Sequence, residues 1–258
     1  MNLEIKTPLK GSQKVVVHLF LICFSCLFSS ILNAQLSTWD FPIKPGMEEW
    51  NRLKTEQERI NAVQIPEDIL NQLSSEELVE LCMKFPLFGD FTAFNTFQYG
   101  FEIMAARFNI FDHLLSRKDA GKYLLKAYKD AGISGFKTLP YSNEFWSIKL
   151  YYIELVITQR NIIQELTSDE KIELLVEARR KFSEKITIES FATLPGLQTS
   201  VRIMASVLYI EKFPEFETSQ RRQAAVQFIN TGMIDDVPTI FEIVKMADNY
   251  INAKNNVR

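Results

Sequence analysis

Imidazole and thiol side chains are nearly absent from this chain of 258 residues, which contains two histidines and three cysteines. His18, Cys23 and Cys26 lie in an N-terminal region that we expect to be removed, which leaves His113 and Cys82. A zinc site built from several His or Cys ligands and an internal disulfide are therefore excluded in the processed chain. We interpret Cys82 as a buried, unreactive thiol and His113 as a residue on a helix surface.

The sequence also lacks the motifs that hold nucleotides or calcium. It has no phosphate-binding Gly-rich loop, no dinucleotide fingerprint, no calcium loop and no Gly-x-Ser-x-Gly elbow. We therefore expect no cofactor and no metal. Carboxylates are abundant, with 32 Asp and Glu, but no spacing singles out a catalytic pair, so catalytic residues stay undetermined.

Positive charge is not concentrated anywhere along the chain. The formal net charge is -3, and the 29 Lys and Arg residues are scattered. A nucleic-acid-binding protein normally gathers its cations on one face. The composition therefore argues against nucleic acid as a partner.

The N-terminus has the pattern of a secretory signal peptide. Lys6, Lys10 and Lys14 precede a stretch, 15–32, without Asp, Glu, Lys or Arg, and the small residue Ala34 follows. This order predicts export, with cleavage near Ala34 and a secreted or periplasmic product. A permanent membrane anchor and a lipoprotein at Cys26 are the alternatives. No later stretch is apolar enough to span a membrane, so we expect none after cleavage.

Two prolines in the segment 35–46 indicate an extended lead-in, and helical periodicity begins at about residue 47. We predict one all-α domain over 47–258, as a multi-helix array or an irregular helical bundle, with a solenoid as the open alternative. Capping boxes at Ser74 and Thr167 mark two helix starts. The expected helices cover a first one around Trp50–Ile60, one that begins at Ser74 and ends near Phe85, and 98–114, 117–130, 144–166, 168–186, 197–213, 216–230 and 236–253. The helix over 144–166, apolar on two sides, is the predicted centre of the fold.

Smaller features carry further expectations. Gly132 is expected to cap its helix in the left-handed conformation. The alternation in 185–189 indicates a short extended piece. Glu177 is expected to face water opposite Arg180 and Lys181, which we interpret as part of a solvated basic helix face.

Phenylalanines recur at every third position between residues 85 and 97. Because an α-helix turns past that spacing, and because Pro86 and Gly89 interrupt it, we expect a helix-turn segment with several rings in the core. The alternative is a hydrophobic groove that accepts a partner helix or an apolar ligand. The residues of that candidate groove are Phe85, Phe88, Phe91, Phe94 and Phe97.

Three short segments carry a resemblance: Ile65-Pro-Glu-Asp-Ile-Leu70, Leu87-Phe-Gly-Asp90 and Arg117-Lys-Asp-Ala-Gly121. They resemble a family of secreted and envelope proteins of Bacteroidetes-type bacteria that has no assigned activity. The resemblance implies an envelope or extracellular setting and transfers no catalytic residue.

Three functions remain open at this point. The leading hypothesis is an interaction module that binds a protein or envelope component through a helical surface, which would not be an enzyme. The first alternative is a carboxylate-dependent hydrolase or lyase acting on glycan or cell-wall material. The second is a carrier of an apolar small ligand.

Overall fold

The computed structural model describes residues 39–133, 143–188, 194–234 and 236–256, and these residues form helices and no strand. The predicted all-α fold is confirmed. The expected signal peptide lies outside the described residues, while 39–46 is non-helical as expected. In chain order the helices are α2 (Glu48–Arg52), α3 (Glu56–Ala62), α4 (Glu67–Gln72), α5 (Ser75–Met83), η1 (Asp90–Ala93), α6 (Phe97–Arg107), α7 (Asn109–Ser116), α8 (Ala120–Asp130), α9 (Asn143–Ile157), α10 (Arg160–Glu165), α11 (Ser168–Ile186), α12 (Leu194–Ile210), α13 (Pro214–Thr218), α14 (Arg222–Thr231) and α15 (Val237–Asn255).

Local capping chemistry places two helix starts as predicted. Ser74 caps α5 and Thr167 caps α11, each with a glutamate three residues later that bonds back to the cap. The predicted helix 168–186 is confirmed at both ends. A third capping box, at Thr55, begins α3 and was not foreseen.

Several predicted helices are wrong because the structure divides them. The helix 98–114 is interrupted at Phe108, and 144–166 is interrupted between α9 and α10. The helix 216–230 is replaced by α13 and α14, and the first helix by α2 and α3. Periodicity did not reveal the break at Phe108 because the buried residues Phe101, Met104, Phe108 and Phe111 keep helical spacing across it.

Contacts between distant segments lie at two of the breaks. At Phe108 the backbone is extended, and the Asn109 N–H donates to the side chain of Gln64 at 3.1 Å instead of continuing the helix. At the end of α9, the Gln159 amide donates to Gln98 at 3.1 Å. At Phe108 a partner 45 residues away thus takes the backbone N–H at the break, and at the end of α9 a partner 61 residues away holds the side chain of Gln159.

The left-handed cap occurs at a different glycine from the one predicted. Gly132 does not have a positive φ, and its N–H donates to Asp130 O at 2.8 Å in a tighter turn. Gly232 has a φ of 71° and donates to Phe228 O at 2.8 Å, which ends α14. The predicted extended piece over 185–189 is also wrong where it is described, because α11 continues through Ile186.

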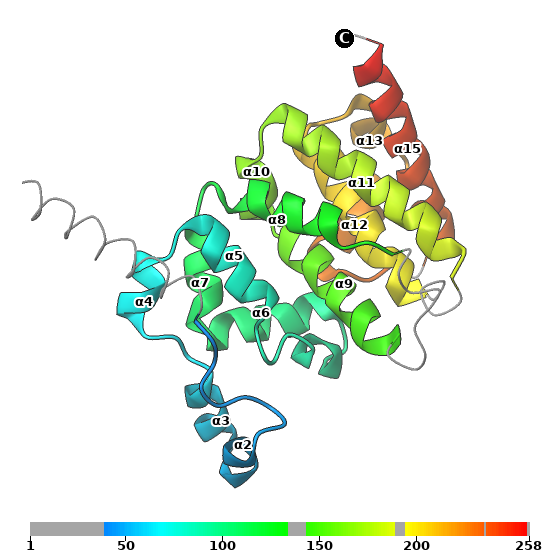
Figure 1. Ribbon diagram of the computed structural model, residues 1–258. Helices are drawn as coiled ribbons and strands as arrows, with labels where there is room; N and C mark the ends of the chain where they lie inside the picture. Colours follow the sequence, from blue (N-terminus) through cyan, green and yellow to red (C-terminus); the bar gives the residue numbers. More distant parts are fainter. Residues whose placement is uncertain (1–38, 134–142, 189–193, 235, 257–258) are drawn as a thin grey trace, which may run out of the picture.

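The helices pack in two groups that α9 joins (Figure 1). In the first group α7 packs against both α5 and α6, and α5 also packs on α8. In the second group α12 packs against α11, α13, α14 and α15. Residues 150–158 of α9 and its end are buried on every side, as predicted for a central helix. However, α12 contacts more neighbours than α9 and is an equally central element.

The aromatic residues of the first group form a continuous core. The ring of Phe85 lies 4.9 Å from that of Phe108, 5.4 Å from that of Phe111 and 5.8 Å from that of Phe41 in the lead-in. Edge-to-face pairs of this kind add to the stabilisation from burial. The lead-in is thereby fixed to the body of the domain. Of the helices in the described ranges, none is both long and apolar enough to cross a membrane.

Candidate functional site

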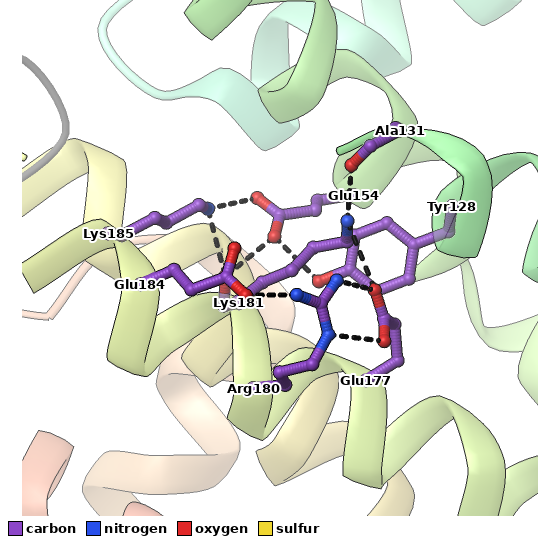
Figure 2. Close-up of polar contacts among 9 residues, drawn as sticks. Tyr128, Ala131, Glu154, Glu177, Arg180, Lys181, Glu184 and Lys185 are labelled. Atoms are coloured by element: carbon purple, nitrogen blue, oxygen red, sulfur yellow. Dashed lines mark hydrogen bonds and ion pairs between the residues drawn. The ribbon is translucent and has the colours of Figure 1, made fainter. Parts of the chain in front are cut away.

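A carboxylate and an ammonium meet in the interior of the domain, where α9 passes α11 (Figure 2). Glu154 Oε2 lies 2.5 Å from Lys185 Nζ, and neither side chain is exposed. Taking two charges out of water is costly unless each finds a full set of partners. The partners of this pair therefore determine what it can do.

Every polar atom of the pair has such partners. Glu154 Oε1 accepts from the Tyr128 hydroxyl at 2.8 Å and from the Ser200 hydroxyl at 2.6 Å. Oε2 accepts from Thr199 as well as from Lys185. Lys185 Nζ also contacts Ser200 Oγ at 2.8 Å and Gly196 O at 3.0 Å. These residues join α8, α9, α11 and α12, and we call them the Glu154 network.

A second buried lysine extends this network towards the surface (Figure 2). Lys181 Nζ donates to Ala131 O, lies 3.1 Å from Glu177 Oε1 and sits 4.9 Å from the centre of the Tyr128 ring. Arg180 holds the same glutamate through two nitrogens, at 2.9 and 2.6 Å. The expectation that Lys181 and Glu177 face water is wrong, because Lys181 is fully buried and Glu177 is 9% exposed. The turn after α8 supplies a carbonyl acceptor that the helix pattern alone does not reveal.

Burial and these contacts shift the pKa values of the ionisable groups in the network. Burial lowers the pKa of Lys185, while Glu154 opposes that change. Burial raises the pKa of Tyr128, and the charge of Glu154 adds to it. Desolvation acts to raise the pKa of Glu177, but Arg180 and Lys181 outweigh it, so this pKa is lowered.

Ser200 next to Lys185 has the composition of a nucleophile with its base, but the geometry does not support that role. The Ser200 hydroxyl donates to Glu154, and Lys185 donates to several acceptors, so neither group is free for a substrate. Both side chains have zero exposure. A nucleophile and base must reach the reacting atoms. We therefore assign the Glu154 network to holding four helices in register.

A groove runs over the surface of α5, α8 and α9. It consists of two adjoining hollows of about 260 and 470 Å³ that share Met83, Ala127, Asp130 and Lys149. We call it the α5–α8–α9 groove. Its apolar lining is Val79, Met83, Tyr123, Ala127, Ala131, Leu150 and Ile153, and its charged lining is Glu76, Glu80, Lys84, Lys126, Asp130 and Lys149.

Two buried hydrogen bonds attach the walls of this groove to its α9 wall. Tyr128 on α8 donates to Glu154, and Tyr152 on α9 donates to the backbone carbonyl of Cys82 on α5 at 3.0 Å. The three helices are thus fixed relative to one another beneath the groove. A pre-formed groove loses less conformational freedom when it binds a partner.

Another cavity, of about 530 Å³, lies between the N-terminal helices and α6. Trp50 and Phe94 contribute aromatic walls, and Glu56 and Asp90 contribute carboxylates. Arg107 forms a 2.5 Å ion pair with Glu56. Desolvation raises the pKa of Asp90, although its side chain still reaches solvent, and the charge of Arg107 opposes the rise. We call this the Trp50–Phe94 cavity.

The five phenylalanines of the candidate apolar groove do not line one surface. Phe85 and Phe91 are fully buried, and Phe88, Phe94 and Phe97 are half-buried. Four of the five rings pack against core aromatic residues, including Tyr152 and Tyr151. Only Phe94 lines one of the cavities described in this section. The predicted helix-turn segment is confirmed, since η1 and turns fill the chain between α5 and α6.

Cys82 and His113 have separate environments. Burial raises the pKa of Cys82 to about 12, and Sγ lies 3.0 Å from the Tyr152 hydroxyl. His113 Nε2 lies 2.9 Å from Glu67 at the surface of α7. The prediction that Cys82 is buried is confirmed, and its raised pKa favours the neutral thiol over the nucleophilic thiolate. Within the described ranges, no three His, Cys, Asp or Glu side chains gather as a metal site would require.

Comparison of the chain with family models, curated proteins and solved structures finds no match. The assignment of sites therefore rests on geometry and chemistry. Sequence reasoning did not identify Glu154 or Lys185. A usable signal was present, because Glu154 is the only charged residue in the apolar run 150–157.

Proposed function

We propose that this chain is an exported interaction module that binds an amphipathic helix of a partner protein in the α5–α8–α9 groove. The observation that carries the proposal is the groove itself, with an apolar floor about Met83 and Ala127 and charges along its edges. Helix-in-groove recognition places an apolar stripe against such a floor. The partner is therefore a helix with an apolar stripe, flanked by charges of both signs.

The groove has charges of both signs in each of its two hollows. Glu76, Glu80, Lys84 and Lys126 line the first hollow only, where Lys126 pairs with Glu76 at 2.8 Å, whereas Lys149 and Asp130 line both. Charges of both signs on the bound helix would pair with these edges. The buried hydrogen bonds under the floor support a binding mode in which the groove changes little.

Replacement of a small residue at the centre of the floor tests the proposal. Ala127 lines both hollows and is half-buried, so Ala127→Gln fills the groove with little change in helix propensity. Ala106→Gln on the exposed face of α6 is the matched control. Each variant is first checked for unaltered thermal unfolding. It is then used to capture crosslinked partners from an envelope extract of its own bacterium.

We expect one protein captured by the wild type and by Ala106→Gln but lost with Ala127→Gln. With that partner purified, the Kd should rise at least about tenfold in Ala127→Gln. Equal capture by both variants contradicts the proposal. Recovery of no wild-type-specific protein contradicts it as well.

The exported state is a separate part of the proposal. The order of Lys6–Lys14, the apolar stretch and Ala34 supports it, together with the resemblance to envelope proteins. Mass spectrometry of the protein secreted by a Bacteroidetes host should give a mature N-terminus at Gln35. A chain that keeps residues 1–34 and sediments with membranes would show an anchor instead.

A second candidate, a hydrolase acting on glycan, is favoured by the Trp50–Phe94 cavity. The cavity is lined by Asp90, whose pKa is raised, and by a second carboxylate, Glu56. A carboxyl with a raised pKa can act as a general acid, and aromatic faces can pack on sugar rings. In this case Asp90→Asn should lower the release of reducing ends from cell-wall glycan by about 100-fold or more. Asp112→Asn, an exposed acid on α7, should leave it unchanged. If the pure wild-type protein does not hydrolyse cell-wall glycan, the hydrolase hypothesis is wrong.

A further inference from the structure

A cavity separate from the α5–α8–α9 groove lies between α6, α12 and α14 and has a volume of about 400 Å³. Its size falls within the usual range for small-molecule sites. Thr158 lies at its inner part, and Arg160 and Asn230 are exposed at its mouth. Glu102 of α6, Arg202 and Ser206 of α12, and Val226 and Ile229 of α14 also line it.

The interior of this cavity holds a cation without a counter-ion. Arg202 is 6% exposed, and the one hydrogen bond that it makes with the described residues runs from Nε to Ile229 O at 2.9 Å. Nη1 is closed to bulk water and has no hydrogen-bond partner in the described part of the chain. No carboxylate there lies within ion-pair distance of the guanidinium; Glu102 acts on it only through its charge. Burial lowers the pKa of Arg202 to about 10, so the group stays charged at neutral pH.

A second donor without a partner lies one helical turn further along α12. Ser206 Oγ is buried and forms no hydrogen bond within the described residues, and the side chain is 3% exposed. Residues four apart on a helix share a face, so Arg202 and Ser206 line the same side of the cavity.

Leaving such groups unpaired is costly in a folded protein. A buried polar group without a partner loses its hydration and regains nothing, and this loss is largest for a charge. A leucine or methionine at position 202 would pack in the same place without this cost. The arrangement is therefore that of a site whose missing acceptor comes from a ligand.

We propose that this cavity binds a small organic carboxylate, with its carboxyl group on Arg202 and Ser206 and its apolar part against Val226 and Ile229. A guanidinium with an adjacent hydroxyl matches the two oxygens of a carboxylate. The aliphatic and aromatic side chains on the α12 and α14 walls suit a short hydrocarbon portion. Glu102 at the cavity repels added negative charge, which favours a monoanion over a phosphate dianion.

The test uses the full chain and four probes: butyrate, its neutral isostere butyramide, inorganic phosphate, and chloride at matched ionic strength. Binding is measured by calorimetry and by the shift of the thermal unfolding midpoint. We expect butyrate to bind and to raise the midpoint, butyramide and chloride to have no effect, and phosphate to bind more weakly. Equal effects of butyrate and butyramide, or phosphate binding as tight as butyrate, would overturn the proposal, as would no butyrate binding.

Variants connect the binding to the named residues. Arg202→Met should weaken butyrate binding about 10- to 100-fold, the range expected when a charged hydrogen bond is lost. The same variant without ligand should unfold at an equal or higher temperature, because it removes an unpaired buried charge. Arg52→Met, on exposed α2, is the matched control and should bind as the wild type does.

A purely structural arginine gives the opposite pattern. If Nη1 of Arg202 is hydrogen-bonded to a permanently bound water and Arg202 only stabilises the fold, Arg202→Met unfolds at a lower temperature. Butyrate then has no effect on the wild type. Ser206→Ala keeps the proposal testable should Arg202→Met fail to fold. It removes a single hydroxyl, and butyrate affinity should fall several-fold; unchanged affinity would overturn the assignment of Ser206.

Discussion

The hydroxyl of Tyr128 donates to Oε1 of Glu154 at 2.8 Å. This hydrogen bond connects α8, which forms one wall of the α5–α8–α9 groove, to α9 at the centre of the domain. Both residues are fully buried. The Lys181 ammonium lies over the ring of Tyr128. Tyr128 therefore contacts Lys181 directly and is connected to Lys185 through Glu154. A polar contact inside an apolar core thus adds to the packing that holds α8 against α9.

Tyr128→Phe removes this bond and keeps the ring. Glu154 Oε1 retains Ser200 as a donor, so we expect a loss of about 1–2 kcal/mol in the free energy of unfolding. Urea denaturation followed by circular dichroism measures it. Tyr99→Phe is the control, since Tyr99 is 52% exposed and should change stability by less than about 0.5 kcal/mol. An equal effect of both variants would show that the bond does not stabilise the fold.

Glu154 and Lys185 should be strongly coupled. Lys185→Met alone leaves a buried carboxylate without its cation, and Glu154→Leu alone leaves a buried ammonium, so each should cost about 3–5 kcal/mol. The double variant removes both charges and should be more stable than the sum of the two losses predicts, by about 2 kcal/mol. Denaturant unfolding of the four proteins measures this coupling. If the two losses in unfolding free energy are additive, Glu154 and Lys185 are not energetically coupled and the prediction is wrong.

Local chemistry in the sequence was sufficient for the helix starts and insufficient for the interior charges. The capping boxes at Ser74 and Thr167 predict the starts of α5 and α11 from the sequence, because a capping box involves only four consecutive residues. Lys181 was misplaced at the surface because its acceptor, Ala131 O, belongs to a turn 50 residues away. A charge in an apolar run marks a residue that must be satisfied, but the run contains no information about the helix that supplies its partner.

The same reasoning applies to the candidate sites. Arg202 lies between Val201 and Ile203 in an apolar helix, but neighbours along a helix point to different faces, so its burial was not predicted from the sequence. That Nη1 lacks an acceptor depends on what α6 and α14 place around it, which only the fold reveals. The phenylalanine spacing is conspicuous in the sequence, and four of the five rings pack in the core, as the main expectation for this segment had it.

Acid should destabilise the domain partly through Glu177. The pKa of this carboxyl is lowered in the folded protein from an ordinary value of 4.5, because Arg180 and Lys181 outweigh its desolvation. A lowered folded pKa means that the stabilisation is fully present above pH 4.5 and is lost as the pH falls through the folded value. Unfolding free energy measured between pH 6 and pH 3 should therefore fall less steeply in Glu177→Gln than in the wild type. Glu165→Gln, which removes an exposed carboxylate, should retain a steeper fall than Glu177→Gln.

Two glycines in helices should respond differently to alanine, because different atoms surround them. A Cβ at Gly100 would lie 2.3 Å from Phe91 O and 2.7 Å from Phe91 Cα, so α6 would have to move away from η1. A Cβ at Gly121 would meet mainly the end of the Leu166 side chain, at 2.7 Å, which can rotate.

Alanine gains about 1 kcal/mol of helix propensity at both sites, while overpacking costs about 1–3 kcal/mol and most where backbone must shift. We expect Gly100→Ala to be clearly destabilising and Gly121→Ala to be near neutral, as measured by urea unfolding. Equal stability of the two variants would show that α6 and η1 are not in close backbone contact. Because α6 also borders the Trp50–Phe94 cavity, a displaced α6 in Gly100→Ala should change the shape of that cavity while leaving the α5–α8–α9 groove intact.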